Sequence, residues 1–256
     1  MLEFWKITGA VAGLALIAGV TAFSAPRLDG PAPQTSVNGE WHIEAEGARI
    51  IGGFGDNFAY DGEDVRPLEG KATMRLDPEA GTGRLEIELR TTPASGPIQF
   101  SKDQAWEGEI RIVQRLNTSQ MDMARIAEDI WLHGDTGNEA PVMPKLYNYF
   151  ATWGPSKIWV NGEEVVPMIG SHTMFSEQAR GESGKIVNAE GRVYSPRLDD
   201  KTGFADSSET EFHYVAHTTE PSEENFPPHT AWIHLHFSDV EVEQKPDDIE
   251  IPYTSQ

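Results

Sequence analysis

Short segments in which apolar and polar residues alternate recur along the chain from about residue 40 onward. Residues 71–76 and 84–89 each place three apolar side chains on one face, and the stretch 77–83 between them is rich in residues that favour turns. Because side chains alternate across a strand, this spacing indicates strands with one buried face. The pattern predicts a β-hairpin.

Asn161-Gly162 predicts a second hairpin, since a two-residue turn needs left-handed backbone angles that Asn and Gly tolerate. Its strands would be residues 157–160 and 163–166. An aromatic run, residues 146–153, is expected to end at Gly154-Pro155. Other expected strands are residues 40–51, 106–116, 192–194, 211–217 and 231–243.

One segment, Ser119 to Trp131, has the features of a helix. Ser119 can cap it, Asp122 lies in its first turn, and Met123, Ala127 and Ile130 fall roughly along one side. With many short strands and one short helix, the chain is predicted to be all-β and mainly antiparallel, a β-sandwich or an open barrel. Residues 39–256 would form this β-rich domain, as one unit or as two β subdomains.

The N-terminal segment resembles an export signal. Residues 7–23 form an uncharged apolar run behind a short head with one basic residue, Lys6. The sequence Ala22-Phe23-Ser24 suits cleavage by a signal peptidase before Ala25. The alternative is an uncleaved membrane anchor formed by residues 7–23. Residues 1–24 are therefore predicted to be a signal peptide or a membrane anchor, and residues 25–38 a flexible linker. The expected location is extracytoplasmic, either periplasmic or secreted. If the segment is an anchor, the protein would be attached to the inner membrane.

Charge and the absence of cysteine exclude several function classes. Asp and Glu total 41 against 20 Lys and Arg, so the net charge of −21 repels nucleic acid. Since the chain contains no cysteine, it has no disulfides, thiolate metal sites or cysteine nucleophiles. A blue-copper site is excluded for the same reason.

Histidines supply the candidate chemistry. On a strand over residues 231–237, His234 and His236 would share one face, with their backbones roughly 6.5 to 7 Å apart, which allows both imidazoles to reach one metal ion. The competing interpretation is an ordinary strand with a polar outer face. His133, in a glycine-bounded loop, and His172, two residues before Met174, are candidates for further ligands. The expected ion is Cu or Zn.

Another pair, His213 and His217, lies four residues apart on one expected strand, so the two backbones are about 13 Å apart and cannot easily chelate one ion. These two side chains are expected on the surface or facing a partner. Three functions follow from the sequence as alternatives: an exported binding or assembly module with a protein or glycan partner, a metal-dependent binding protein or enzyme, and a glycan-directed hydrolase or binder.

Overall fold

The computed structural model describes residues 39–55, 60–139, 141–195, 202–223, 227–247 and 249–251. The predicted signal or anchor and the linker, residues 1–38, lie outside the described residues. Within the described part of the chain, no helix has the length and apolar character needed to cross a membrane.

The described residues form strands and connecting loops. The strands are β1 (Trp41–Gly53), β2 (Arg66–Pro67), β3 (Glu69–Asp77), β4 (Thr82–Arg90), β5 (Ile98–Ser101), β6 (Gln104–Trp106), β7 (Glu109–Asn117), β8 (Arg125–Leu132), β9 (Leu146–Val160), β10 (Glu163–Gln178), β11 (Asp206–His217) and β12 (Trp232–Gln244).

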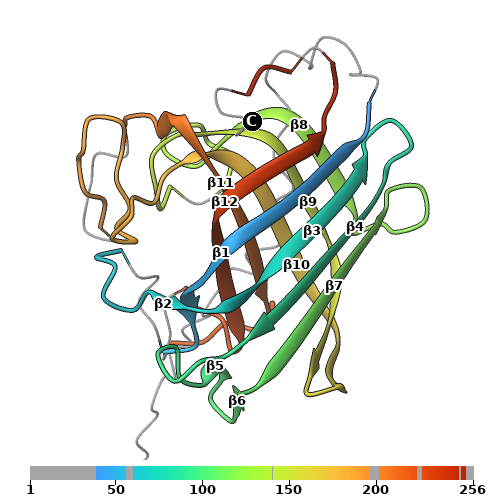
Figure 1. Ribbon diagram of the computed structural model, residues 1–256, viewed down its shortest axis with the longest axis vertical. Helices are drawn as coiled ribbons and strands as arrows, with labels where there is room; N and C mark the ends of the chain where they lie inside the picture. The colour runs from blue at the N-terminus through green and yellow to red at the C-terminus, as the bar shows by residue number, and fades with distance from the viewer. Residues whose placement is uncertain are drawn as a thin grey trace, which may run out of the picture.

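The main sheet closes on itself. Its strand order is β10-β11-β12-β1-β3-β4-β7-β9-β8, and β9 also pairs with β10, so the first strand of the path joins the last but one and the sheet forms a ring (Figure 1). All pairings between the named strands are antiparallel. The predicted mainly antiparallel all-β fold is confirmed, in the form of a ring-like sheet. Both predicted hairpins are present, as β3–β4 and β9–β10.

The predicted helix at Ser119 to Trp131 is wrong. The chain makes two short hydrogen-bonded turns, one closed on the Asn117 carbonyl and one on the Met121 carbonyl, and then enters β8, which pairs with β9. Ser119 bonds the Asn117 side chain at 2.8 Å and caps no helix. Met123 stays 47% exposed and Trp131 39% exposed, so the apolar side expected of a helix has no core to cover. Pairing with β9 therefore outweighs a weak local helix preference.

Gly154-Pro155 does not end the aromatic strand as predicted. Along one edge of β9, residues 146–153 pair with β8 and residues 156–160 pair with β7, so the two residues fall between partners. Pro155 has no N–H to donate, and at this position no ladder bond is lost on that edge. The segment expected to be a strand at residues 192–194 forms only an isolated bridge, Val187 to Val193.

Two separate apolar clusters lie on opposite faces of the sheet. Inside the ring, the larger cluster contains Trp41, Phe150, Phe175 and inward side chains of β12 such as Leu235. The smaller cluster lies outside the ring, where residues 179–195, here named the covering segment, pack over the sheet. Its main members are Trp153, Met174, Ala179, Ile186, Tyr194 and Trp232. Figure 1 shows this orange segment beside β11 and β12. Both faces of the first half of β12 are consequently buried.

The interior of the ring also holds a polar network. Gln114 donates to Ser171 Oγ at 2.9 Å and accepts from Thr152 Oγ1 at 3.0 Å. Thr152 also bonds Thr173 at 2.6 Å, and Ser171 bonds Ser156 at 2.7 Å. All five side chains are buried, and each has a partner, so hydrogen bonds that join β7, β9 and β10 offset the desolvation of these groups.

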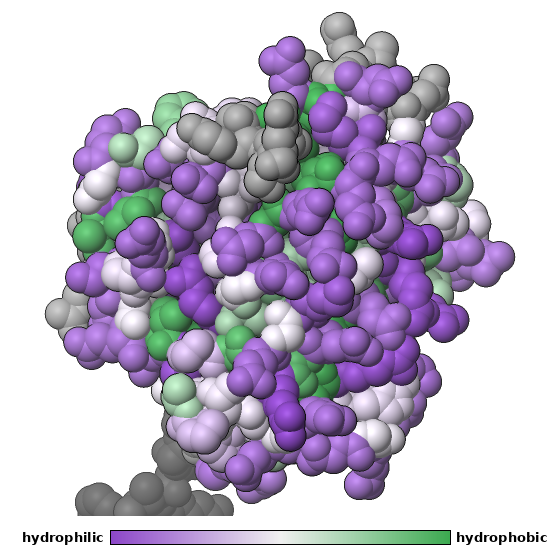
Figure 2. Space-filling model, viewed as in Figure 1, coloured by the Kyte–Doolittle hydropathy of each residue, from purple (hydrophilic) through white to green (hydrophobic). Residues whose placement is uncertain are grey.

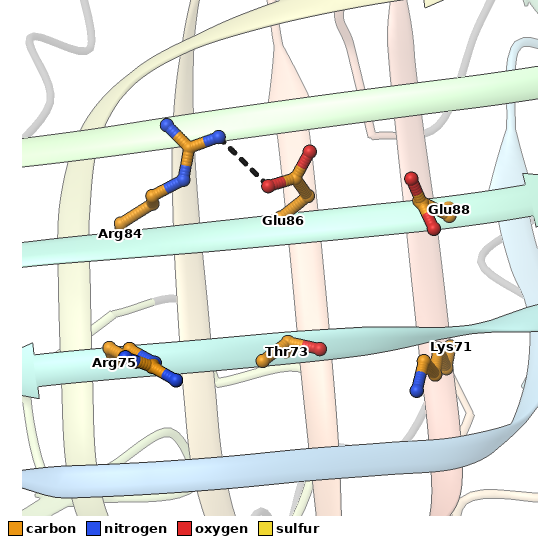
Figure 3. A pocket seen from close by; sticks show the side chains of 6 residues that line it. All are labelled: Lys71, Thr73, Arg75, Arg84, Glu86 and Glu88. Atoms are coloured by element: carbon orange, nitrogen blue, oxygen red, sulfur yellow. Dashed lines mark hydrogen bonds and ion pairs between the residues drawn. The ribbon is translucent and has the colours of Figure 1, made fainter.

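The outer face of β3 and β4 is a charged surface exposed to solvent. Figure 2 shows a mostly hydrophilic face. Side chains of β3 and β4 line a depression of about 340 Å³ on this surface, and Figure 3 draws them: Lys71, Thr73, Arg75, Arg84, Glu86 and Glu88. Glu86 bonds Arg84 at 2.8 Å and also pairs with Arg111, while Lys71 pairs with Glu44 at 2.8 Å. Because these charges largely neutralise one another at the surface, we do not assign a site here.

Candidate metal centre

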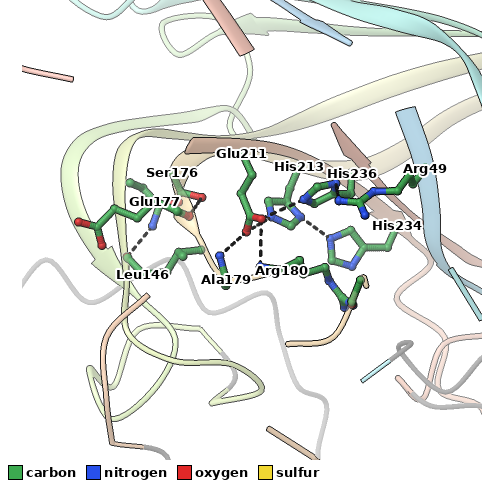
Figure 4. Close-up of polar contacts among 12 residues, drawn as sticks. Arg49, Leu146, Ser176, Glu177, Ala179, Arg180, Glu211, His213, His234 and His236 are labelled. Atoms are coloured by element: carbon green, nitrogen blue, oxygen red, sulfur yellow. Dashed lines mark hydrogen bonds and ion pairs between the residues drawn. The ribbon is translucent and has the colours of Figure 1, made fainter. Parts of the chain in front are cut away.

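Two neighbouring strands bring the polar centre together. His213 on β11 lies directly opposite His236 on β12, and Val215 lies opposite His234. Glu211 is two residues before His213, so it shares the same outward face. The covering segment lies over this face, and Glu211, His213 and His236 each have 0% exposed surface while His234 has 1%. Figure 4 shows the four side chains side by side.

Glu211 is the hub of the centre. Its Oε1 accepts from His213 Nε2 at 2.7 Å and from the Ala179 backbone N–H at 2.9 Å. Its Oε2 accepts from His236 Nε2 at 2.9 Å and from the Arg180 backbone N–H at 3.1 Å. One carboxylate therefore joins β11 and β12 to the first residues of the covering segment.

Each of the two histidines on Glu211 has a second partner at its other ring nitrogen. His213 Nδ1 lies 3.0 Å from His234 Nε2, and one of these two nitrogens donates to the other. His236 Nδ1 lies 3.1 Å from Arg49 Nη2, across the β1–β12 pairing. The centre is thus a continuous chain of hydrogen bonds from Arg49 to His234.

The charges in the centre shift its pKa values in different directions. Burial alone would raise the pKa of Glu211, but His213 and the hydrogen bonds from His213 and His236 outweigh it and hold that pKa well below its ordinary value. Burial lowers the pKa of His236 to about 4 despite the neighbouring Glu211. Burial, His213 and Arg180 lower the pKa of His234 well below its ordinary value. Glu211 is therefore ionised and both strand β12 imidazoles are neutral at pH 7.

Glu211, His213 and His236 can hold a metal ion. Each offers a ligand atom, and these atoms all lie within 4.8 Å of one another. Carboxylate oxygen and imidazole nitrogen are both ligands of Zn²⁺, at about 2.0–2.2 Å. Tetrahedral coordination places ligand atoms about 3.3 Å apart, so the present 2.7 and 2.9 Å contacts would widen by about 0.5 Å.

Two buried or partly buried guanidinium groups flank the centre. Arg180 has 0% exposed surface and donates from Nη1 to the Gly184 carbonyl at 2.7 Å. Burial lowers its pKa to about 10, while Glu211 opposes that shift. Arg49 adds a second cation beside His236. The single carboxylate of Glu211 therefore faces two cations before any metal ion binds, which weakens the attraction for that ion.

Of the four histidines predicted from the sequence as metal ligands, one belongs to this group, one contacts it, and two lie outside it. His236 belongs to the group that can hold a metal, and His234 contacts that group through His213. His172 is on the outward face of β10, opposite Val215, with its ring 6.3 Å from Trp153. Burial and three nearby histidines lower its pKa to about 3. His133 is buried in the loop after β8, and neither His172 nor His133 is in the group.

Sequence reasoning missed Glu211 and His213. His213 is fully buried, so the expectation that it lies on the surface is wrong. His217 is partly buried, and its ring stacks on His229 at 3.8 Å. One pattern could have found the two missed residues: Glu211-x-His213 and His234-x-His236 have the same spacing on successive strands, and antiparallel pairing places His213 directly opposite His236.

Comparison with known proteins gives no family. No protein-family model matches the chain, and no significant match was found among curated proteins or solved structures. The function must therefore be inferred from the geometry of the centre.

Proposed function

We propose that this chain is an extracytoplasmic protein that binds a divalent metal ion, preferentially Zn²⁺, at Glu211, His213 and His236. The observation that carries the proposal is the group itself: three ligand atoms from two paired strands lie within 4.8 Å of one another and are shielded from solvent. The lowered pKa of His236 favours it, because an imidazole must be neutral to coordinate a metal, and His236 is neutral at pH 7.

Two histidines and one glutamate leave a fourth position of a tetrahedral ion for another ligand. Since the three side chains have no exposed surface, a large substrate does not reach that position without movement of the covering segment. A binding or structural role for the ion follows more directly than turnover of a polymer. We therefore favour a metal-binding module over a metal-dependent or glycan-directed enzyme.

Metal binding to the purified full chain tests the proposal. Zn²⁺ that binds only the folded state, at about a hundredfold excess over its dissociation constant, should raise the free energy of unfolding by about 2.7 kcal/mol. His213→Ala and His236→Ala should abolish most of this gain. His42→Ala is the matched control, since His42 pairs with Glu243 away from the centre. Equal gains in all variants, or none in the wild type, would show that the centre is a metal-free hydrogen-bond network.

Export is part of the proposal and has its own test. The support is the apolar run at residues 7–23, together with the small residues Ala22 and Ser24 at the positions that a signal peptidase recognises. Expressed in a bacterial host, the chain should appear outside the inner membrane, and mass spectrometry of the soluble form should find Ala25 as the first residue. Intact Met1 found only in membranes would favour the anchor. Accumulation of the full chain in the cytoplasm would contradict both.

A further inference from the structure

Arg49 connects the candidate metal centre to the covering segment. It lies on β1 directly opposite His236 of β12. Its Nη2 is 3.1 Å from His236 Nδ1, and its Nη1 donates to the Glu182 carbonyl at 3.3 Å. Figure 4 shows the guanidinium extending from β1 toward the His236 ring.

The contact with Arg49 determines which nitrogen of His236 carries the proton. A guanidinium has only donors, so Arg49 donates and His236 Nδ1 accepts. The proton of the neutral ring is then on Nε2, where it donates to Glu211 Oε2 at 2.9 Å. Both ring nitrogens are thereby satisfied in one tautomer.

Metal coordination requires the opposite tautomer. To bind an ion through Nε2, His236 must move its proton to Nδ1, and a metal-bound histidine ordinarily donates that N–H to an acceptor. Arg49 offers no acceptor, so two N–H groups would face each other. His213 has no such conflict, because His234 Nε2, 3.0 Å away, is able to accept a hydrogen bond from His213 Nδ1.

We propose that Arg49 regulates the metal centre: its hydrogen bond to His236 and an ion on His236 Nε2 exclude each other, so the ion binds only when Arg49 moves away. This inference rests on the metal-binding function proposed above. It also implies that binding releases the Arg49 contact with Glu182 and thus one of the bonds that hold the covering segment.

The surrounding charges are consistent with a guanidinium that has two positions. Toward the centre, Arg49 interacts with Glu211 and shares the site with the cation of Arg180. Toward the surface, it interacts with Asp239 on β12. Asp239 lines a depression of about 430 Å³ together with Glu44, Glu46, Glu209 and Glu241. A divalent cation that binds at the centre repels the Arg49 guanidinium, and the carboxylates of this depression can pair with the displaced guanidinium.

Three substitutions of Arg49 in the full chain test the proposal, with Zn²⁺ affinity measured by competition with a chromophoric chelator. Arg49→Gln removes the charge and supplies an oxygen that accepts from His236 Nδ1, so affinity should rise at least about tenfold. Arg49→Met removes the charge without an acceptor and should give a smaller rise. Arg49→Lys keeps a cationic donor and should stay close to wild type.

The outcomes separate the two proposals. Wild-type binding with equal or weaker binding by both Arg49→Gln and Arg49→Met overturns the role of Arg49 and leaves the metal site intact. Tight binding by Arg49→Lys equal to that of Arg49→Gln overturns it as well. Absence of Zn²⁺ binding in the wild type and in every variant overturns the metal site itself, and the role of Arg49 with it.

A second measurement addresses the tautomer directly and needs no affinity change. In ¹⁵N histidine spectra of the metal-free wild type, His236 should carry its proton on Nε2. After Zn²⁺ is added, the proton should be on Nδ1. Protonation of Nδ1 before metal is added would remove the basis of the proposal.

Discussion

Glu211 shows how one buried residue can determine the packing of a whole segment. Its two oxygens receive four hydrogen bonds, two from β11 and β12 histidines and two from backbone amides of the covering segment. Removal of the carboxylate would leave these donors buried without an acceptor and would take a counter-charge away from Arg49 and Arg180.

Glu211→Ala should therefore lower the free energy of unfolding by about 3–5 kcal/mol, as expected when one partner of a buried charged network is removed. Denaturation in urea measures this. Glu209→Ala, two residues earlier on the same strand but exposed, is the control and should change stability by less than about 0.5 kcal/mol. Similar small effects of both substitutions would mean that the hydrogen bonds of Glu211 contribute little.

The histidine pKa values predict that stability falls on acidification. The pKa of His236 is about 4 in the folded protein, below the ordinary 6.5, and that of His234 is also lowered. Between these values the unfolded chain binds more protons, so the free energy of unfolding decreases as pH falls from about 6.5 toward 4, by up to about 1.4 kcal/mol per pH unit for each such group. Glu211 adds a further loss only below about 4.5, because its folded pKa is the lower one.

Urea denaturation at several pH values across this window tests the expectation. His236→Asn should reduce the pH dependence, since a side chain that titrates in the unfolded state is removed. Stability that is constant, or that increases on acidification, would contradict the assignment of neutral histidines to the folded centre.

Among the elements, the β9–β10 hairpin has a second role beyond reversing the chain. Asn161 has φ of 51° and Gly162 has φ of 83°, as a tight two-residue turn requires. The Asn161 side chain also accepts from the Glu109 backbone N–H at 2.9 Å and donates to the Glu107 carbonyl at 2.9 Å. A β-carbon at Gly108 would lie 2.3 Å from Asn161 Oδ1. The turn therefore fixes the start of β7.

Asn161→Gly separates the contribution of the turn's backbone conformation from that of the Asn161 side-chain hydrogen bonds. Glycine adopts the positive φ without strain, so the folded state loses only the two side-chain hydrogen bonds. With the greater freedom of glycine in the unfolded chain, the expected cost is about 1–2 kcal/mol in the free energy of unfolding. Chemical denaturation gives the value, and the far-UV spectrum should remain that of the wild type. A neutral effect would show that the bonds to Glu107 and Glu109 are replaced by water.

At the scale of the whole molecule, the two apolar clusters are not equivalent. The cluster inside the ring is enclosed by paired strands, whereas the outer cluster depends on the covering segment. That segment is attached by a few loop hydrogen bonds, such as Ala189 N–H to the Phe204 carbonyl at 2.9 Å and Ile186 N–H to the Tyr60 carbonyl at 3.2 Å. Segments with few long-range backbone bonds open at lower free energies than core strands.

Native-state hydrogen exchange should show this difference. The amides of Val187 and Tyr194 should exchange through an opening several kcal/mol less costly than that of the β3–β4 amides. In Glu211→Gln the Ala179 and Arg180 amides should lose protection while β3 and β4 keep theirs. A single opening free energy for all of these amides would mean that the molecule unfolds as one unit.

Local sequence patterns alone predicted most of the long strands, the two hairpins and the two faces of residues 232–237, because alternation and turn residues act over a few positions. The false helix at Ser119 to Trp131 shows the limit of such patterns: pairing with β9 lies beyond their range. Only the tertiary structure decided that the His234 and His236 face is buried, since residues 179–195 cover it, and only β11–β12 pairing brought Glu211 and His213 to His236. A site assembled from separate strands depends on register and packing, which are long-range interactions, whereas the strands themselves depend on short-range ones.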